Sequence, residues 1–255
     1  MKQPAIFLSH GAPTLAVEQT SQTRAWAALA GELARPSAIL AVSAHWDTDK
    51  PAVSGVARPQ TIHDFNGFPR ELYEVRYPAP GAPQLAERTA RLLGDAGLAC
   101  AIDPTRGLDH GAWVPLKWMY PEADIPVTQL SVQSHRGARH HYDLGRAIAP
   151  LRDEGVLILC SGGIVHNLRE IQWQATSPVD WAQQFNDWIA ARAVTGAVEE
   201  LLDYRNHAPS AIRSHPTEEH MEPFFTALGA GGEPVKRLEL GFELGTLGMD
   251  SYVFG

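Results

Sequence analysis

Histidines are the residues of this chain whose type and spacing point most directly to chemistry. The 255-residue sequence contains eleven of them. Three of these, His10, His45 and His166, follow apolar stretches that read AIFLS, AILAVSA and VLILCSGGIV. A neutral imidazole is a good ligand for iron, zinc, copper and nickel, and small neighbours such as Ser9 and Gly11 let a metal ion or a substrate approach closely. This pattern predicts a metal site made by imidazoles.

The same apolar stretches explain how histidines so far apart in the sequence could meet. Short apolar runs of this kind are typical of buried β-strands, and ligands bind at the carboxyl ends of the strands in an open α/β sheet. Three strands that end near a histidine would bring three imidazoles to one edge. Each histidine alone could be a loop or core residue with satisfied hydrogen bonds, because metal binding requires convergence. The coincidence of three strand ends favours the metal site.

The other histidines either extend this group or lie outside it. The segment HPTEEHMEP adds His215 and His220, and GLDHGAWVPL places His110 either in the same pocket or in a turn. The role of His63, in TIHDFNGFP, stays undecided. The remaining histidines lie in polar surroundings and are expected to be solvated: His135, His140, His141 and His207.

Strands that alternate with helices must position these side chains. The expected strands are Ala5–Leu8, Ala38–Val42, Ile125–Val132 and Val156–Cys160. The expected helices are Thr23–Leu33, Pro83–Leu93, Tyr142–Leu151, Trp181–Val194 and Thr217–Leu228, the last with Thr217 as its N-cap. This alternation predicts an α/β fold in a single domain over residues 1–255, with a mainly parallel sheet covered by helices on both faces. The segment Glu239–Phe254 could add a late strand or hairpin.

An irregular segment between these elements is expected to form a structured loop over the pocket. Residues Asp64–Pro83 are rich in Gly, Pro and aromatic residues, which is too irregular for a core element and too apolar for a disordered linker. Its aromatic side chains could contact a flat substrate ring or pack beneath the loop. They are Phe65, Phe68, Tyr73 and Tyr77.

Composition excludes several other classes of protein. The net charge is −8 and no Lys/Arg run is present, which argues against a nucleic-acid partner. No apolar stretch approaches the roughly 20 residues of a membrane span, and the N-terminal apolar run is too short for a signal peptide, so we expect a cytoplasmic protein. Cys160 ends an apolar run and is expected to be a buried free thiol rather than a disulfide partner of Cys100. Motifs for nucleotide binding and for serine hydrolases are lacking.

Six segments, in order along the chain, resemble those of the extradiol aromatic ring-opening dioxygenases. They are similar in particular to the 4,5-DOPA dioxygenase branch of the protocatechuate 4,5-dioxygenase β-subunit-like superfamily. The segments are LSHGAPTLA (8–16), SAHWDT (43–48), DFNGFPRELYEVRYPAPG (64–81), GLDHGAWVPL (107–116), SGGIVHNL (161–168) and HPTEEHMEP (215–223). The resemblance implies a mixed, mostly parallel sheet with helices on both faces and a metal held by histidines.

The resemblance also implies roles for individual residues. His10, His45 and His220 match the metal-binding positions, and His166 matches a histidine at the metal that is either an additional ligand or the acid–base residue. His110 matches a pocket histidine near the substrate and is the second expected catalytic residue, which would hydrogen-bond the substrate or bound oxygen. The other residues expected to contribute to substrate binding are His215, Phe65 and Phe68. Because some members of the wider superfamily use a carboxylate ligand, Glu218 and Glu219 stay open as alternatives to His220.

The function implied is that of a non-haem metal-dependent extradiol dioxygenase, which opens a DOPA-like or related catechol ring with O2. Fe(II) is expected for catalysis, and Zn(II) can occupy such a nitrogen site because it binds more tightly than Fe(II). Asp47 either orients the imidazole of His45 or is a solvated carboxylate. The expected partners are the catechol and O2, and homo-oligomer formation stays open. The alternatives are a zinc-dependent hydrolase of similar architecture and a non-catalytic metal- or small-ligand-binding protein.

Overall fold

Ten β-strands and ten α-helices make up the computed structural model, which describes residues 1–255. The strands are β1 (Ala5–Ser9), β2 (Ala38–Asp47), β3 (Ala52–Ser54), β4 (Ala101–Asp103), β5 (Val127–Val132), β6 (Val156–Gly162), β7 (Val235–Leu238), β8 (Phe242–Glu243), β9 (Leu247–Gly248) and β10 (Ser251–Phe254). The helices are α1 (Ser21–Glu32), α2 (Arg70–Glu74), α3 (Pro83–Asp95), α4 (His110–Met119), α5 (Gly137–Ile148), α6 (Asp180–Thr195), α7 (Val198–Leu202), α8 (Tyr204–His207), α9 (Ala211–Ser214) and α10 (Glu222–Gly231).

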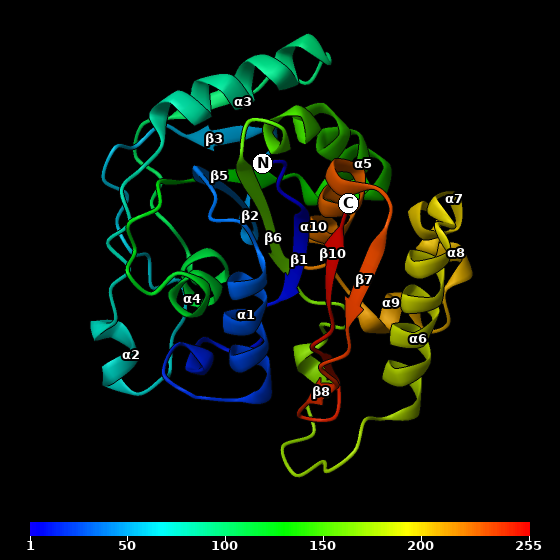
Figure 1. Cartoon of the computed structure of the whole chain (residues 1–255). Coiled ribbons are helices and arrows are strands. Elements are labelled where there is room, and N and C mark those ends of the chain that lie inside the picture. Colours follow the sequence, from blue (N-terminus) through cyan, green and yellow to red (C-terminus); the bar gives the residue numbers. More distant parts are fainter.

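Eight of the strands form one sheet in the order β4-β3-β5-β2-β6-β1-β10-β7 (Figure 1). At its centre β2 pairs in parallel with β5 and β6, and β6 pairs in parallel with β1. Antiparallel pairs flank this centre, because β10 joins β1 and β7 on one side and β3 joins β5 on the other. The predicted mixed, mostly parallel sheet is therefore confirmed, and the C-terminal segment does supply a late strand, β10.

The central strands are apolar throughout because both faces of the sheet are covered. In β1, Ala5 and Phe7 belong to one hydrophobic cluster, while Ile6 and Leu8 belong to a second cluster on the opposite face. Successive side chains of a strand point to opposite faces, so an uninterrupted apolar run is what a strand buried on both sides requires.

Helices cover both faces, as predicted. Buried residues of α3, α5, α6 and α10 join the cluster that contains Phe7, whereas those of α1 and α4 join the cluster that contains Ile6. Figure 1 shows α1 and α4 on one side of the central strands and α5, α6 and α10 on the other, with α3 at the top of the view. The strands β1, β2 and β6, whose carboxyl ends form one edge of the sheet, are thereby packed between helices on both faces.

The predicted helix Thr217–Leu228 begins later than expected, so the assignment of Thr217 as its N-cap was wrong. Helix α10 begins at Glu222, and Pro223 occupies its first turn. Proline lacks an N–H and is tolerated in the first turn of a helix but not in the interior, where a start at Thr217 would have placed it. The preceding residues form turns instead, and His220 lies in them.

The expectation that His140 and His141 are solvated was also wrong. Both belong to α5 and both are buried, His141 completely. The Nδ1 of His141 donates to the carbonyl of Gly137, and its Nε2 accepts the backbone N–H of Gln133, so each ring nitrogen has a partner inside the protein. Helix α5 packs on α10, which covers the face where these side chains lie.

The metal-free protein is expected to lose stability as the pH falls from 7 to 5. Burial lowers the pKa of His141 to about 3 and that of the fully buried His215 to about 4, whereas histidines in the unfolded chain titrate near 6.5. The unfolded state therefore binds these protons first. These two neutral histidines therefore stabilise the folded state above about pH 6.5, and this stabilisation is lost as the pH falls toward their folded-state pKa values. By pH 5 the free energy of unfolding should have fallen by about 2 kcal/mol per histidine. Urea unfolding of EDTA-treated protein at the two pH values measures the loss, and equal midpoints would contradict it.

Two further expectations concern the cysteines and the membrane. Cys100 and Cys160 are both free, and Cys160 is fully buried, as predicted. Burial raises the pKa of the Cys160 thiol well above its usual range, which makes this sulfur unreactive. None of the helices combines the length and apolar character needed to cross a bilayer.

Candidate metal centre and active site

A cavity of about 860 Å³ opens at the carboxyl ends of β1 and β6. Five histidines line it: His10, His45, His110, His166 and His220. The structure thus brings together the five histidines predicted for metal binding and catalysis. A cavity of this size suits a small aromatic ligand.

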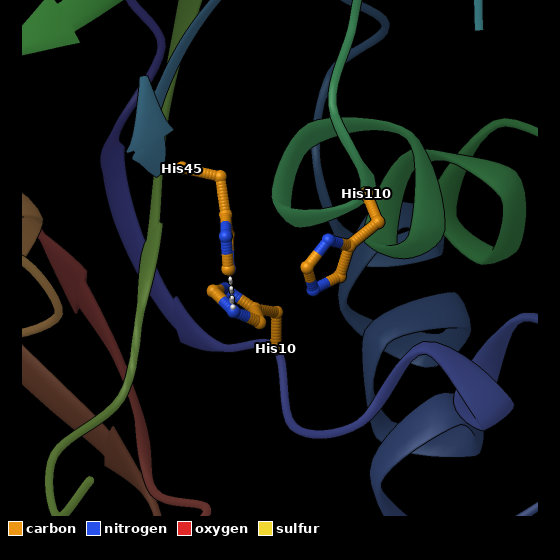
Figure 2. Close-up of side chains that lie close together, drawn as sticks. All are labelled: His10, His45 and His110. Carbon is orange, nitrogen blue, oxygen red and sulfur yellow. Dashed lines mark hydrogen bonds between the residues drawn. The ribbon is translucent and has the colours of Figure 1, made fainter. Parts of the chain in front are cut away.

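His10 and His45 face each other across this cavity. His10 follows the last residue of β1, and its Nε2 lies 3.0 Å from Nε2 of His45 (Figure 2). Two nitrogens bound to one ion at about 2.0–2.1 Å lie about 3 Å apart, so this pair is spaced as two ligands of one metal would be. The Nδ1 of His10 is 2.9 Å from Oγ of Ser161, which orients the ring.

His45 reaches the cavity from within a strand rather than from beyond its end. Strand β2 continues to Asp47, and its register against β5 shifts between Val42 and Asp47. Such an irregularity re-aims side chains near functional sites. The expected run Ala38–Val42 is only the regular part of this strand.

His220 completes a triangle with these two residues. Its ring centroid lies 5.4 Å from that of His10 and 5.0 Å from that of His45, and the His10 and His45 centroids are 4.9 Å apart. The Nδ1 of His220 contacts Oε1 of Glu219 at 3.1 Å, while its Nε2 is buried and has no hydrogen-bond partner. A buried polar atom without a partner is costly, and a metal ion would satisfy this one.

The carboxylates beside His220 are engaged elsewhere. Glu218 accepts a hydrogen bond from the hydroxyl of Tyr204 and lies near Arg205, away from the cavity. Glu219 accepts the hydroxyl of Thr217 at the oxygen that contacts His220. Of the three alternatives at this position, only His220 has an atom that is buried and free.

His166 and His110 flank the triangle on opposite sides. The ring of His166 stacks on that of His220 with a centroid separation of 3.4 Å and an interplanar angle of 7°. The ring of His110, the first residue of α4, lies 4.0 Å from that of His45. Potential ligand atoms of His10, His45 and His110 also lie within 4.8 Å of one another, as do those of His166, Glu219 and His220.

The environment keeps four of the cavity imidazoles neutral at physiological pH. Burial, reinforced by the neighbouring histidines, holds the pKa values of His10 and His220 well below the usual range. Burial lowers the pKa of His45 to about 4 and that of His166 to about 4. Because only a neutral imidazole has a free electron pair, the cluster is ready to bind a cation without first releasing protons.

Two glycines allow the surrounding elements to approach this closely. A β-carbon on Gly111 would lie 2.4 Å from Oγ of Ser43 and 3.1 Å from Cδ2 of His45, so α4 could not pack against the site with any larger residue. A β-carbon on Gly162 would lie 2.1 Å from the carbonyl oxygen of His220. Glycine at these positions therefore permits the contacts that converge the histidines.

Asp64 is a site residue that sequence reasoning missed. Its Oδ2 lies 3.0 Å from Nδ1 of His110 and 3.3 Å from Nδ1 of His45, and its Oδ1 accepts the backbone N–H of His110. Burial acts to raise the pKa of Asp64, but its hydrogen bonds and charge interactions with His110 outweigh this effect and hold the pKa at about 2. An ionised Asp64 thus orients two imidazoles and leaves their Nε2 atoms available. Its position at the start of the DFNGFP segment was the only feature of the sequence that could have pointed to this role.

Replacing Asp64 by asparagine is expected to weaken metal binding by about 10- to 100-fold, the usual cost of losing an acceptor that orients a metal-bound imidazole. Asp47→Asn provides the matched control, because the Asp47 carboxylate accepts hydrogen bonds from Ser134 and makes none to His45. Competition with a chelator of known affinity measures the difference. Equal affinities in the two variants would show that Asp64 does not support the site.

Asp47 and His215 do not have the contacts that their expected roles at the site would require. The suggestion that Asp47 orients His45 is corrected by its contacts with Ser134. His215 is fully buried and does not line the cavity, since its Nε2 donates to the carbonyl of Ile164. The expectation that His215 contacts substrate was therefore wrong. Its hydrogen bond instead joins the segment after β6 to the segment before α10.

The aromatic loop borders the cavity, as predicted, but only some of its aromatic side chains line it. Phe65 and Phe68 line the cavity on the same side as His110. Tyr77 is buried, and its hydroxyl donates to the carbonyl of Tyr120, so it packs beneath the loop. His63 also supports the loop, with its Nε2 3.0 Å from the carbonyl of Val75.

The fold and the site define a class: an α/β protein with a cluster of histidines, able to hold a metal ion, at the carboxyl edge of its sheet. Residues 4–255 match the family model described as the catalytic LigB subunit of aromatic ring-opening dioxygenase. The chain belongs to this family, and the predicted extradiol dioxygenase class is confirmed; the hydrolase and the non-catalytic binding protein are not favoured.

Relatives over the full length agree with this assignment. A "4,5-DOPA dioxygenase extradiol" from Escherichia coli (strain K12) is 44% identical, with 100% of this chain and 95% of the relative covered. A protein of the same name from Beta vulgaris is also 44% identical, with 97% and 95% covered. A solved structure of an uncharacterized protein from Escherichia coli K12 matches with a TM-score of 0.85 at 40% identity and covers all of both chains.

Proposed function

We propose that this chain, as one catalytic domain of residues 1–255 acting in the cytoplasm, uses non-haem Fe(II) to open the ring of a DOPA-like or related catechol. The observation that carries the proposal is the His10–His45–His220 triangle, in which one imidazole nitrogen is buried without a partner. The names of the full-length relatives support the substrate class. Zn(II) would fit the same nitrogens and can be carried through purification.

In this proposal His10, His45 and His220 hold the metal. A ferrous ion with three protein ligands supplies open positions where a catechol and O2 are brought together and electron density passes between them. Phe65 and Phe68 provide an apolar wall against which the flat ring can lie.

We assign the acid–base role to His166. An imidazole binds a metal with an electron pair that lies in the ring plane. The ring of His166 stacks nearly parallel on that of His220 at 3.4 Å, so the two imidazoles lie side by side and do not converge on one point. This supports His166 as a proton acceptor for a catechol hydroxyl rather than as a further ligand. His110, oriented by Asp64, is placed to hydrogen-bond the substrate.

Anaerobic loading tests the proposal. Metal-free protein is loaded with Fe(II) and, in parallel, with Zn(II), and each form is mixed with DOPA or 4-ethylcatechol before O2 is admitted. We expect stoichiometric O2 uptake and the absorbance of a ring-opened semialdehyde only with Fe(II). Binding of Fe(II) without O2 uptake for any catechol would reject the proposed function.

A further inference from the structure

The cavity beyond the histidines has an unusual charge distribution. None of its lining residues is a lysine or an arginine, whereas three are glutamates: Glu18, Glu219 and Glu243. Glu219 is engaged with His220 and Thr217. The side chains of Glu18 and Glu243 have no cationic partner, so the cavity contains negative charge that the protein itself does not neutralise.

Glu243 stands close to the metal ligands. It ends β8, which pairs with β9, and a β-carbon on Gly11 would lie 3.2 Å from its Oε2. Gly11 directly follows His10. A ring substituent that extends past this residue therefore meets a carboxylate rather than solvent.

Glu243 and Glu18 also act on each other. The Glu243 side chain is partly buried, and burial followed by the charge of Glu18 raises its pKa. Two carboxylates that repel in a partly desolvated position are stabilised by a cation between or beside them. Both glutamates line the same cavity as His220, whose 5%-exposed side chain has an unpartnered Nε2, so they border the site where we expect the catechol to bind.

The other walls do not offer an alternative site for a charged substituent. They are formed largely by apolar side chains, among them Phe65, Phe68, Trp173, Leu247 and Met249. A carboxylate placed here would find neither an arginine nor a lysine and would approach Glu243. Burying an unpaired charge of this kind is costly.

We propose that Glu243 and Glu18 form a cation-recognising subsite that selects catechols with an amine on the side chain over catechols with a carboxylate. This inference rests on the proposed function, because it assumes that the catechol hydroxyls bind at the histidines. The amine donates hydrogen bonds to Glu243, and Glu18 adds a longer-range attraction. An amino acid side chain, which carries both charges, falls between the two extremes.

Three catechols test the subsite, in which a two-carbon chain carries an ammonium group, no further group or a carboxylate: dopamine, 4-ethylcatechol and dihydrocaffeate. Their anaerobic affinities for the Fe(II)-loaded protein are measured first, and their kcat/KM values afterwards. A charge-assisted hydrogen bond predicts that dopamine is preferred over 4-ethylcatechol by about 10- to 100-fold. Dihydrocaffeate is expected to be the poorest of the three.

The variants Glu243→Gln, Glu18→Gln and the double variant should reduce the ratio of dopamine to 4-ethylcatechol, most strongly in the double variant. Glu239→Gln is the matched control, since Glu239 is exposed and lies outside the cavity lining. Iron content verifies that each variant retains its fold. An unchanged ratio in the double variant would overturn the subsite.

The two proposals fail in distinguishable ways. Ring opening of 4-ethylcatechol without a preference for dopamine would reject the subsite alone. A binding preference for dopamine that Glu243→Gln removes, with no ring opening of any compound, would support the subsite and reject the proposed function.

Discussion

Alanine at position 45 is expected to abolish stoichiometric metal binding and, with it, detectable ring opening. The His45 Nε2 lies 3.0 Å from that of His10, and removing it leaves two imidazoles to hold the ion. The loss of affinity should exceed the 10- to 100-fold effect of altering an orienting group. His10→Ala and His220→Ala should behave in the same way, because the three centroids are nearly equidistant. Metal analysis after dialysis measures the occupancy.

His207→Ala is the control for this series. His207 is about half exposed and pairs with Asp203 outside the cavity, so its loss should leave the metal content unchanged.

The His110→Ala variant distinguishes two possible sets of three metal ligands, in which His10 and His45 are joined either by His220 or by His110. Full occupancy in His220→Ala together with metal loss in His110→Ala would move the third ligand to His110.

Substituting glutamine for His166 is expected to preserve iron and catechol binding while lowering turnover by about 10²–10⁴-fold, the usual contribution of a positioned acid–base group. Glutamine keeps a polar side chain of similar reach but cannot take up a proton at neutral pH. The stack on His220 places the His166 ring beside an imidazole that would hold the metal. Iron content and single-turnover rate must be measured on the same preparation.

Two other results are informative for His166. Loss of iron comparable to that in His10→Ala would make His166 a ligand instead of the base. Retention of both iron and a near-normal rate would exclude both roles and would assign proton transfer to His110, whose Nδ1 is held by Asp64.

Much of the framework follows from the sequence alone. The apolar runs around β1, β2 and β6 are long enough and continuous enough to require burial on both faces, which in turn requires helices on both sides. Parallel strands align their carboxyl ends, so the meeting of His10, His45 and His166 follows from local patterns and one topological rule. The ordered motifs add His220 and His110 because their sequences resemble a known family.

Only the tertiary structure decided which neighbouring side chains serve the site. His220 presents a buried nitrogen without a partner, whereas Glu218 accepts the hydroxyl of Tyr204. His215 turns into the interior because the carbonyl of Ile164, distant in sequence, accepts its proton. The contacts of Glu218 and His215 are hydrogen bonds between separate segments, and a local pattern carries no record of them.

The same physical reason explains Asp64, Asp47 and the buried histidines of α5. Asp47 lies two residues after His45, where a regular strand would point both side chains to the same face. The strand is irregular between Val42 and Asp47, however, so Asp47 contacts Ser134 while the distant Asp64 contacts His45. His140 and His141 lie in a polar sequence, but His141 is buried against Glu222 of α10 and His140 is buried beside Gln133. The sequence thus determined the strands, the edge of the sheet and the class of chemistry. Packing between segments far apart in the chain determined which groups are neutral, oriented and free to act there.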